Sequence, residues 1–193
     1  MELPQEFLER MKSMLREEYD DFMKTYEEPR RFGLRVNTLK ISAEDFERRA
    51  EQGEYPFHLK RIPWVNTGFY YEREDDPARH PFYHAGLYYL QEPSAMSPAS
   101  RLEVQPYDKV LDLCAAPGGK ATELVGSLQG KGLLLANDLS DSRAKALLKN
   151  LELTGAPNFY VTSEEPVKLV KNFPEFFDKI LIVGKIYDLL INF

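Results

Sequence analysis

KVLDLCAAPGGK, residues 109–120, reads as a buried strand that runs into a tight turn and then into the start of a helix. Val110, Leu111 and Leu113 form the short apolar run that is typical of a parallel strand covered on both faces. Asp112 interrupts this run near the carboxyl end of the strand. The stretch therefore predicts the first strand of an α/β sheet, with a binding crevice where that strand ends.

The turn after this strand combines small side chains with a free choice of backbone angles. Its residues are Cys114, Ala115, Ala116, Pro117, Gly118, Gly119 and Lys120. Apolar side chains then recur at helical spacing, at Ala121, Leu124, Val125 and Leu128. Such a turn presents the amino terminus of a helix, with its partial positive charge, to the crevice. We expect an anionic group of a ligand to lie there.

A second strand is predicted in GLLLAND, residues 132–138, and ends on an acid. Asp138 stands 19 residues after Gly119, at the distance where an acid commonly accepts hydrogen bonds from ribose hydroxyls. Asp138 is therefore the predicted ribose ligand.

Two common phosphate-binding motifs fit this stretch poorly. A P-loop requires glycine where Cys114 stands and a serine or threonine where Ala121 stands, so Lys120 is not a Walker lysine. A dinucleotide fingerprint requires three spaced glycines, and only the pair Gly118-Gly119 is present. A nucleotide-dependent oxidoreductase is disfavoured by this and stays open as an alternative.

Composition excludes several classes of protein. The chain has 193 residues, a net charge of −6, one cysteine and no run of about 18 apolar residues, which predicts a cytoplasmic globular protein without a membrane segment. A single cysteine and the scattered His58, His80 and His84 predict no metal site. Three basic clusters remain, at Arg30-Arg31 with Arg35, at Arg48-Arg49 and at Lys60-Arg61. From the residues alone, each is expected to be a solvated face, and only the resemblance described below raises them to an RNA-facing surface.

The first 80 residues alternate between helical and strand patterns. Residues 3–27 predict one or two amphipathic helices, and residues 32–39 predict a strand. Ser42 begins a short helix that Gly53 ends, and residues 57–71 predict one or two strands before a charged loop at 72–81. The expected module is α+β.

The remainder of the chain continues the α/β pattern. A strand at 87–90 precedes a helix that begins at Pro93, and the aromatic residues nearby could form core or stack on bases. After Asp138, a helix begins after Ser140 and ends at Gly155. Further strands are predicted at 158–162 and 177–183. Arg143 lies in the first turn of its helix, where the dipole does not favour a cation, so we expect it to bind a ligand or a carboxylate.

The run GLYYLQEPSAMSPASRLEVQPYDKVLDLCAAPGGKATEL, residues 86–124, resembles the S-adenosylmethionine (SAM) site of the RNA cytosine-C5 methyltransferases that modify rRNA and tRNA. The motif CAAPGGK is specific to that family, and Asp138, Arg143 and the pair Asn150 and Gly155 are similar to residues that lie beyond the motif in its members. The bacterial rRNA enzymes of the RsmF type are the most similar group. The resemblance extends to Ile182 and then stops.

The resemblance implies a Rossmann-like SAM-dependent methyltransferase sheet of about four strands, at 81–183, preceded by a ferredoxin-like RNA-associated domain at 1–80. Residues 184–193 form an unmatched tail. SAM is the implied cofactor and RNA, as rRNA, the implied partner. The implied cofactor residues are Cys114, Ala115, Ala116, Pro117, Gly118, Gly119, Lys120, Asp138, Arg143 and Glu165. Glu164 is the alternative to Glu165 at the adenine end, and Ser163 departs from the family pattern.

Methylation of cytosine at C5 requires a thiolate that adds to C6. In the family both functional cysteines lie on later loops, and this sequence has Val183-Gly184-Lys185 where the first of these loops is expected. Cys114 belongs to the SAM loop, so we expect no catalytic residue here and a truncated methyltransferase, either a shortened or a frameshifted product. A SAM- or RNA-binding module without turnover is the second hypothesis, and the oxidoreductase is the third.

Overall fold

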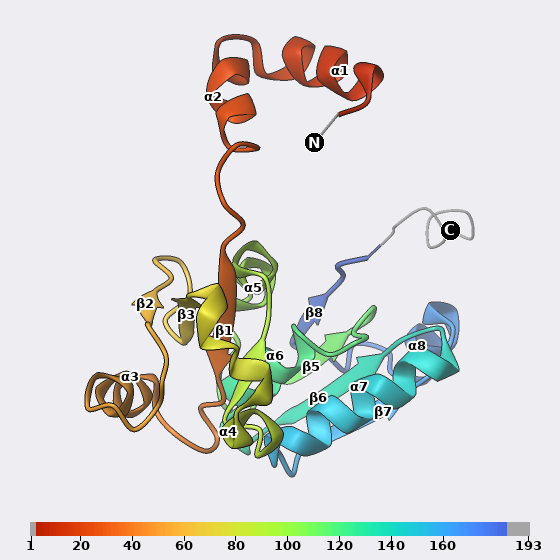
Figure 1. The fold of residues 1–193 in the computed structure, drawn as a ribbon. Coiled ribbons are helices and arrows are strands. Elements are labelled where there is room, and N and C mark those ends of the chain that lie inside the picture. Colours follow the sequence, from red (N-terminus) through yellow and green to blue (C-terminus); the bar gives the residue numbers. More distant parts are fainter. Residues whose placement is uncertain (1–2, 185–193) are drawn as a thin grey trace. The chain divides into compact units, whose positions relative to one another are not determined.

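The computed structural model describes residues 3–184, and β5 (Lys109–Asp112) lies inside a four-stranded parallel sheet (Figure 1). The strand order is β7-β6-β5-β8, with β6 at Leu133–Asn137, β7 at Phe159–Thr162 and β8 at Lys179–Leu181. The chain steps outward from β5 to β7 and then returns to the other side of β5, which is the Rossmann-like arrangement. The predicted fold class is confirmed. The predicted tail lies, from position 185 onward, outside the described residues.

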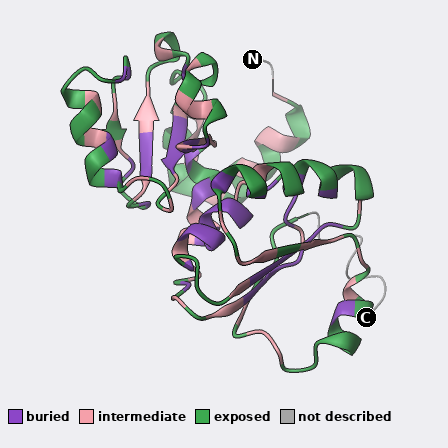
Figure 2. Ribbon diagram, turned by 90° about the horizontal axis from the view of Figure 1, so that it is seen from below, coloured by how far each residue is buried: buried purple, intermediate pink, exposed green. Residues whose placement is uncertain are grey.

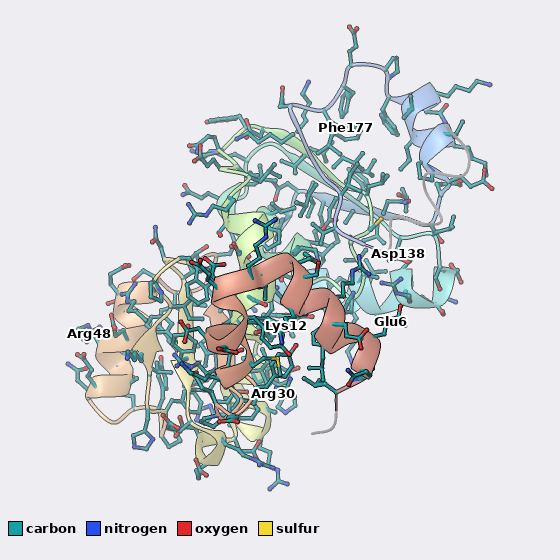
Figure 3. All side chains as sticks on the ribbon, turned by 90° about the horizontal axis from the view of Figure 1, so that it is seen from above. Glu6, Lys12, Arg30, Arg48, Asp138 and Phe177 are labelled. Atoms are coloured by element: carbon teal, nitrogen blue, oxygen red, sulfur yellow. The ribbon has the colours of Figure 1, made fainter. Side chains whose placement is uncertain are left out.

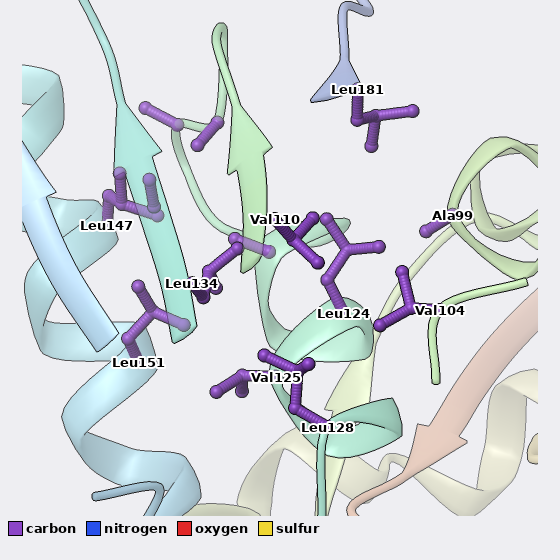
Figure 4. Close-up of a cluster of buried hydrophobic side chains, with 14 residues drawn as sticks. Ala99, Val104, Val110, Leu124, Val125, Leu128, Leu134, Leu147, Leu151 and Leu181 are labelled. Carbon is purple, nitrogen blue, oxygen red and sulfur yellow. The ribbon is translucent and has the colours of Figure 1, made fainter. Parts of the chain in front are cut away.

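Three helices connect these strands: α6 (Ala121–Ser127), α7 (Asp141–Thr154) and α8 (Pro166–Asn172). The main core forms where α6 and α7 pack on one face of the sheet (Figure 4). Its members larger than alanine that are fully buried are Val110, Leu124, Val125, Leu128, Leu134, Leu147 and Leu151. Successive strand residues point to opposite faces, so Leu111 and Leu135 pack instead with Leu169 of α8 in a second cluster. Apolar side chains on both faces of β5 explain its continuous apolar run.

The amino-terminal sheet is antiparallel, with the strand order β2-β3-β1-β4. Its strands are β1 (Phe32–Val36), β2 (Lys60–Arg61), β3 (Gly68–Tyr71) and β4 (Tyr88–Leu90). Helix α3 (Ala43–Glu51) connects β1 to β2, as in the ferredoxin-like fold. The predicted ferredoxin-like character is confirmed by this order.

Helix α3 begins where the sequence predicts. The Ser42 hydroxyl accepts a hydrogen bond from the Asp45 N–H at 3.1 Å, which caps the helix. Phe46 is fully buried and stacks on Tyr55, with ring centroids 4.9 Å apart. Tyr88 is 2% exposed and its hydroxyl donates to the Pro77 carbonyl. Of the aromatic residues near this strand, Tyr88 is therefore core and Phe82 and Tyr83 pack partly buried against it, and Figure 2 shows buried residues along the central strands.

The strand β4 corrects one expectation about domain organisation. The predicted boundary places residues 81–90 in the second domain, but β4 pairs with β1 through Arg35↔Tyr89 and Val36↔Tyr88. The hydrogen-bonded amino-terminal sheet therefore crosses the expected boundary at residue 80. The expected loop at 72–81 contains two 3-10 helices, Arg73–Asp75 and Pro77–Arg79. Helices α4 (Pro81–His84) and α5 (Pro93–Ser100) flank β4, and α5 begins at Pro93 as predicted.

The chain divides into two compact units at Arg30–Arg31. The first contains α1 (Gln5–Leu15), the 3-10 helix Arg16–Glu18 and α2 (Tyr19–Lys24). Contacts among the rings of Phe7, Phe22 and Tyr26 hold these helices together, yet none of their residues is buried. Within residues 3–184, no helix combines the length and apolar character needed to span a bilayer.

Candidate functional site

The motif turn, residues 113–120, leaves the carboxyl end of β5 and leads into α6. Gly118 adopts φ +116°, a conformation that L side chains rarely take. A Cβ at Gly118 would also lie 3.3 Å from both Leu147 Cδ1 and Asn150 Cβ. Glycine is therefore required here by backbone conformation, with close packing against α7 as a second constraint.

Helix α7 holds two consecutive carbonyls of the motif turn. Arg143 donates to the Ala116 carbonyl at 2.7 Å, and the Asn150 side-chain amide donates to the Pro117 carbonyl at 2.7 Å. The sequence predicts a ligand or a carboxylate as the partner of Arg143. The carboxylate is Asp138, 3.3 Å from the guanidinium.

Asp138 lies at the end of β6 and is 3% exposed. One carboxylate oxygen accepts a hydrogen bond from the Ala116 N–H at 3.2 Å, and the other accepts from the Ser140 N–H at 3.1 Å. Asp138 thus joins β6, the motif turn and the start of α7. Asp138 Oδ2 also lies 3.3 Å from the Arg143 guanidinium, whereas Oδ1 keeps a second lone pair that can accept from a ligand.

Asn137 is a site residue that was not predicted from the sequence. It is 1% exposed and bridges the ends of three strands. Its side-chain amide donates to the carbonyls of Leu113 and Glu164, and its side-chain oxygen accepts from the Glu164 N–H at 2.9 Å. These bonds bring the loop that carries Glu164 and the exposed Glu165 to the same edge of the sheet as the motif turn. An asparagine directly before the strand-terminal acid was the only signal for this role.

Asp112 is the second site residue that was not predicted. It is fully buried at the end of β5, and within residues 3–184 neither carboxylate oxygen has a well-formed hydrogen bond. Burial raises the pKa of Asp112 to about 7, a rise that nearby Asp138 adds to and that Lys120 opposes. A carboxyl group in this position is suited to meet a cationic group of a ligand. The signal in the sequence was an acid that interrupts an apolar strand.

Cys114 is partly buried in the motif turn, and its thiol is not activated. Desolvation raises the pKa of Cys114, and the neighbouring carboxylates Asp112 and Asp138 raise it further. A thiol of raised pKa is largely protonated at neutral pH and is a weak nucleophile. The chemistry of this environment agrees with a binding role for the turn.

Arg35 was expected to lie in a basic surface cluster, but the structure buries it. Its side chain is almost completely buried, at 3% residue exposure, and it forms an ion pair with Glu123 at 3.0 Å. The guanidinium also donates to the Gly119 carbonyl of the motif turn at 2.8 Å. A buried and paired guanidinium is not available to bind RNA, so this residue belongs to the architecture of the site.

Other basic residues lie on the surface with acidic neighbours. Arg48 lies on α3 at the outside of its domain (Figure 3) and pairs with Asp45. Arg61 pairs with Glu47. Exposed pairs of this kind are weak and salt-sensitive. The RNA-facing role of these clusters stays a prediction. Within the described residues 3–184, no group of three or more metal-ligating side chains comes together.

Both parts of the chain match known protein families. Residues 3–93 match the model of the N-terminal domain of 16S rRNA methyltransferase RsmF, and residues 99–184 match the model of 16S rRNA methyltransferase RsmB/F. The ribosomal RNA small subunit methyltransferase F of Vibrio campbellii is 37% identical over 187 residues. The corresponding protein of Photobacterium profundum is 38% identical over 191 residues.

These two alignments cover 93% of this chain but 39% of each curated relative. A crystal structure of a methyltransferase homolog protein from Pyrococcus horikoshii superposes with a TM-score of 0.80 at 31% identity. That superposition covers 92% of this chain and 58% of the archaeal chain. The matches extend over both sheets and include the motif turn, so the chain belongs to the RsmB/F family of 16S rRNA methyltransferases.

Proposed function

We propose that this chain binds SAM at the carboxyl ends of β5, β6 and β7 and acts in transfer of the SAM methyl group to C5 of a cytosine in rRNA. The observation that carries the proposal is the acidic character of the crevice. Asp112 is buried and has no well-formed hydrogen bond to its carboxylate among the described residues, and Asp138 lies beside the same turn. SAM has a cationic sulfonium and a cationic amino group, which these carboxylates complement.

Each predicted cofactor residue has a proposed task. The motif turn, residues 113–120, receives the methionine end of SAM, where the Lys120 side chain faces its carboxylate. Asp138 accepts from the ribose hydroxyls, and Glu165 accepts from the adenine amino group. Arg143 contacts the Ala116 carbonyl and Asp138, so its task is to keep the turn and the ribose acceptor in place.

When bound, SAM supplies an electrophilic methyl group. The cytosine must then be made nucleophilic at C5 by a thiolate that adds at C6. Cys114 does not fit this task, because its pKa is raised and it lies in the cofactor turn. The proposed role of the described residues is cofactor binding and, through the amino-terminal domain, contact with cytoplasmic rRNA.

The two alternatives differ in what they require from the crevice. A binding module without turnover uses the same SAM contacts, so only methyl transfer separates it from the enzyme. An NAD-dependent oxidoreductase requires a place for a pyrophosphate with two negative charges. Asp112, buried at the end of β5 beside the motif turn, opposes such a ligand electrostatically, which favours SAM over NAD.

The test is a calorimetric titration of the chain with SAM and, separately, with NADH. We expect SAM to bind and NADH to give no heat of binding. Asp138→Ala should abolish SAM binding, while Asp141→Ala, which removes an exposed acid from the first turn of α7, should leave it unchanged. Circular dichroism on each sample confirms folding. A folded wild-type chain that does not bind SAM would overturn the proposal.

A second assay addresses catalysis. The chain is joined to the carboxyl-terminal region of a curated relative, and methyl transfer to 16S rRNA is measured with radiolabelled SAM. Label at C5 of a cytosine supports the methyltransferase. Tight SAM binding without transfer by the completed protein supports the binding module.

A further inference from the structure

The motif turn is held from a second side by the amino-terminal sheet. Arg35 of β1 reaches the turn with its guanidinium, which donates to the Gly119 carbonyl at 2.8 Å. The same group donates to the Thr122 hydroxyl at 2.6 Å and to the Glu123 carboxylate at 3.0 Å. A residue 84 positions earlier in the chain therefore binds the last part of the turn and the first turn of α6.

Two neighbours of Arg35 extend this contact. The Gln91 side chain accepts from the Arg35 guanidinium at 2.7 Å, and Tyr89 is paired with Arg35 across the sheet. A Cβ added at Gly119 would lie 3.2 Å from the Gln91 amide nitrogen and 3.5 Å from a Tyr89 ring carbon. The edge formed by β1 and β4 thus packs directly on the backbone of Gly119.

Helix α7 and the amino-terminal sheet hold different peptide groups of the motif turn. Helix α7 holds the carbonyls of Ala116 and Pro117 through Arg143 and Asn150, and the amino-terminal sheet holds the carbonyl of Gly119. A peptide group is planar, so a fixed carbonyl also fixes the direction of the N–H of the next residue. Arg35 therefore sets the direction of the Lys120 N–H, at the point where the turn enters α6.

We propose that Arg35 is a positioning residue for SAM binding, which sets the ligand-facing backbone of the motif turn and transmits the position of the amino-terminal sheet to the cofactor site. This inference rests on the proposed function. Because coupling between two sites is reciprocal, SAM should in turn protect β1 and β4 against amide hydrogen exchange.

The experiment must separate positioning from folding. Arg35→Met alone would leave Glu123 buried without a partner and could unfold the chain. The double variant Arg35→Met/Glu123→Leu removes both charges and keeps apolar volume, which preserves stability at many buried ion pairs. The matched control is Arg61→Met/Glu47→Leu, an ion pair of the same domain whose members are partly exposed. Each protein is titrated with SAM and melted thermally.

We expect the Arg35/Glu123 double variant to melt close to the wild type and to bind SAM about tenfold more weakly, because the Gly119 carbonyl has lost a charged donor. The Arg61/Glu47 control should bind like the wild type. Hydrogen exchange should show SAM protecting β1 and β4 in the wild type and in the control, but not in the Arg35/Glu123 variant. Wild-type affinity in a folded Arg35/Glu123 variant would overturn the inference.

Two further results have defined meanings. If the double variant does not fold, Arg35→Lys is tested instead. The lysine ammonium keeps the charge, but it cannot make the several hydrogen bonds by which the planar guanidinium holds Gly119, Thr122 and Glu123 together. Unchanged SAM affinity in Arg35→Lys would then overturn the inference.

If the wild type itself does not bind SAM, the proposed function is wrong. Faster exchange of the backbone amides of Ala116, Gly118, Gly119 and Lys120 in the Arg35/Glu123 variant than in the control would still support the positioning role.

Discussion

The Asn150 side-chain amide donates a hydrogen bond to the carbonyl of Pro117 at 2.7 Å, and so ties the middle of α7 to the motif turn. The two residues are 33 positions apart in the chain. Beside this bond, Gly118 packs on Leu147 and Asn150 so closely that a Cβ would stand 3.3 Å from each. The position of the turn therefore depends on how α7 packs on the sheet.

Asn150→Ala should weaken the hold of α7 on the turn. We expect a loss of about 1 kcal/mol in the free energy of unfolding, since one hydrogen bond to a carbonyl is removed. SAM affinity should fall as well. Urea unfolding and calorimetry measure the two effects, with Asn172→Ala as the control, because its amide bonds a carbonyl on the exposed face of α8. Equal effects of the two substitutions would contradict this role of Asn150.

Asp112 should make stability depend on pH. Its folded pKa of about 7 lies above the unfolded value of 3.8, so the folded state keeps a proton that the unfolded state has lost. Stability should therefore fall as pH rises from 3.8 to about 7, by at most about 4 kcal/mol from this residue.

Asp112→Asn removes the titrating group. The free energy of unfolding of Asp112→Asn minus that of the wild type should rise between pH 3.8 and about pH 7 and stay constant at higher pH. Urea unfolding at a series of pH values measures this difference. Asp141→Asn, at an exposed acid, should give no such trend. A flat difference between Asp112→Asn and the wild type would show that Asp112 ionises normally in the folded chain.

Lys40 should contribute to stability from outside the site. Its ammonium donates to the carbonyl of Ala85 at 2.6 Å and to that of Leu153 at 2.8 Å, in the last turn of α7. Lys40→Met should cost about 2 kcal/mol, because both carbonyls lose a charged donor and the helix terminus loses a favourable cation. Thermal unfolding measures the loss. Lys145→Met serves as control, since Lys145 forms an exposed pair on the same helix and should change little.

Strand β8 should promote self-association. Within residues 3–184 it is an edge strand, paired with β5 on one side, and Ile180 and Ile182 are about half exposed, at 50% and 47%. Exposed apolar edge strands pair with other chains. Ile180→Lys should shift light scattering at high concentration toward monomer. Val170→Lys, at an exposed apolar residue of α8, should not. A wild-type chain that is already monomeric at high concentration would show that β8 does not promote self-association.

Much of the fold is determined by local patterns. The apolar run of β5, the glycines of the motif turn and the Ser42 cap each depend on residues a few positions apart, and each is confirmed. The predicted domain boundary assigned the strand at 87–90 to the second domain, whereas β4 pairs with β1, because an apolar strand pattern does not specify its neighbour. The prediction of a surface cation at Arg35 was wrong, because a single arginine in a strand carries no local sign of its buried partner.

The sequence by itself determined the type of site: a strand, a turn of small residues and an acid at the end of the next strand. These signals are local, since backbone conformation and side-chain periodicity act over a few residues. Only the tertiary structure decided what holds the turn. The bonds from Arg35 to Gly119 and from Asn150 to Pro117 span 84 and 33 positions, and they exist because the packing of two sheets and a helix brings those groups together.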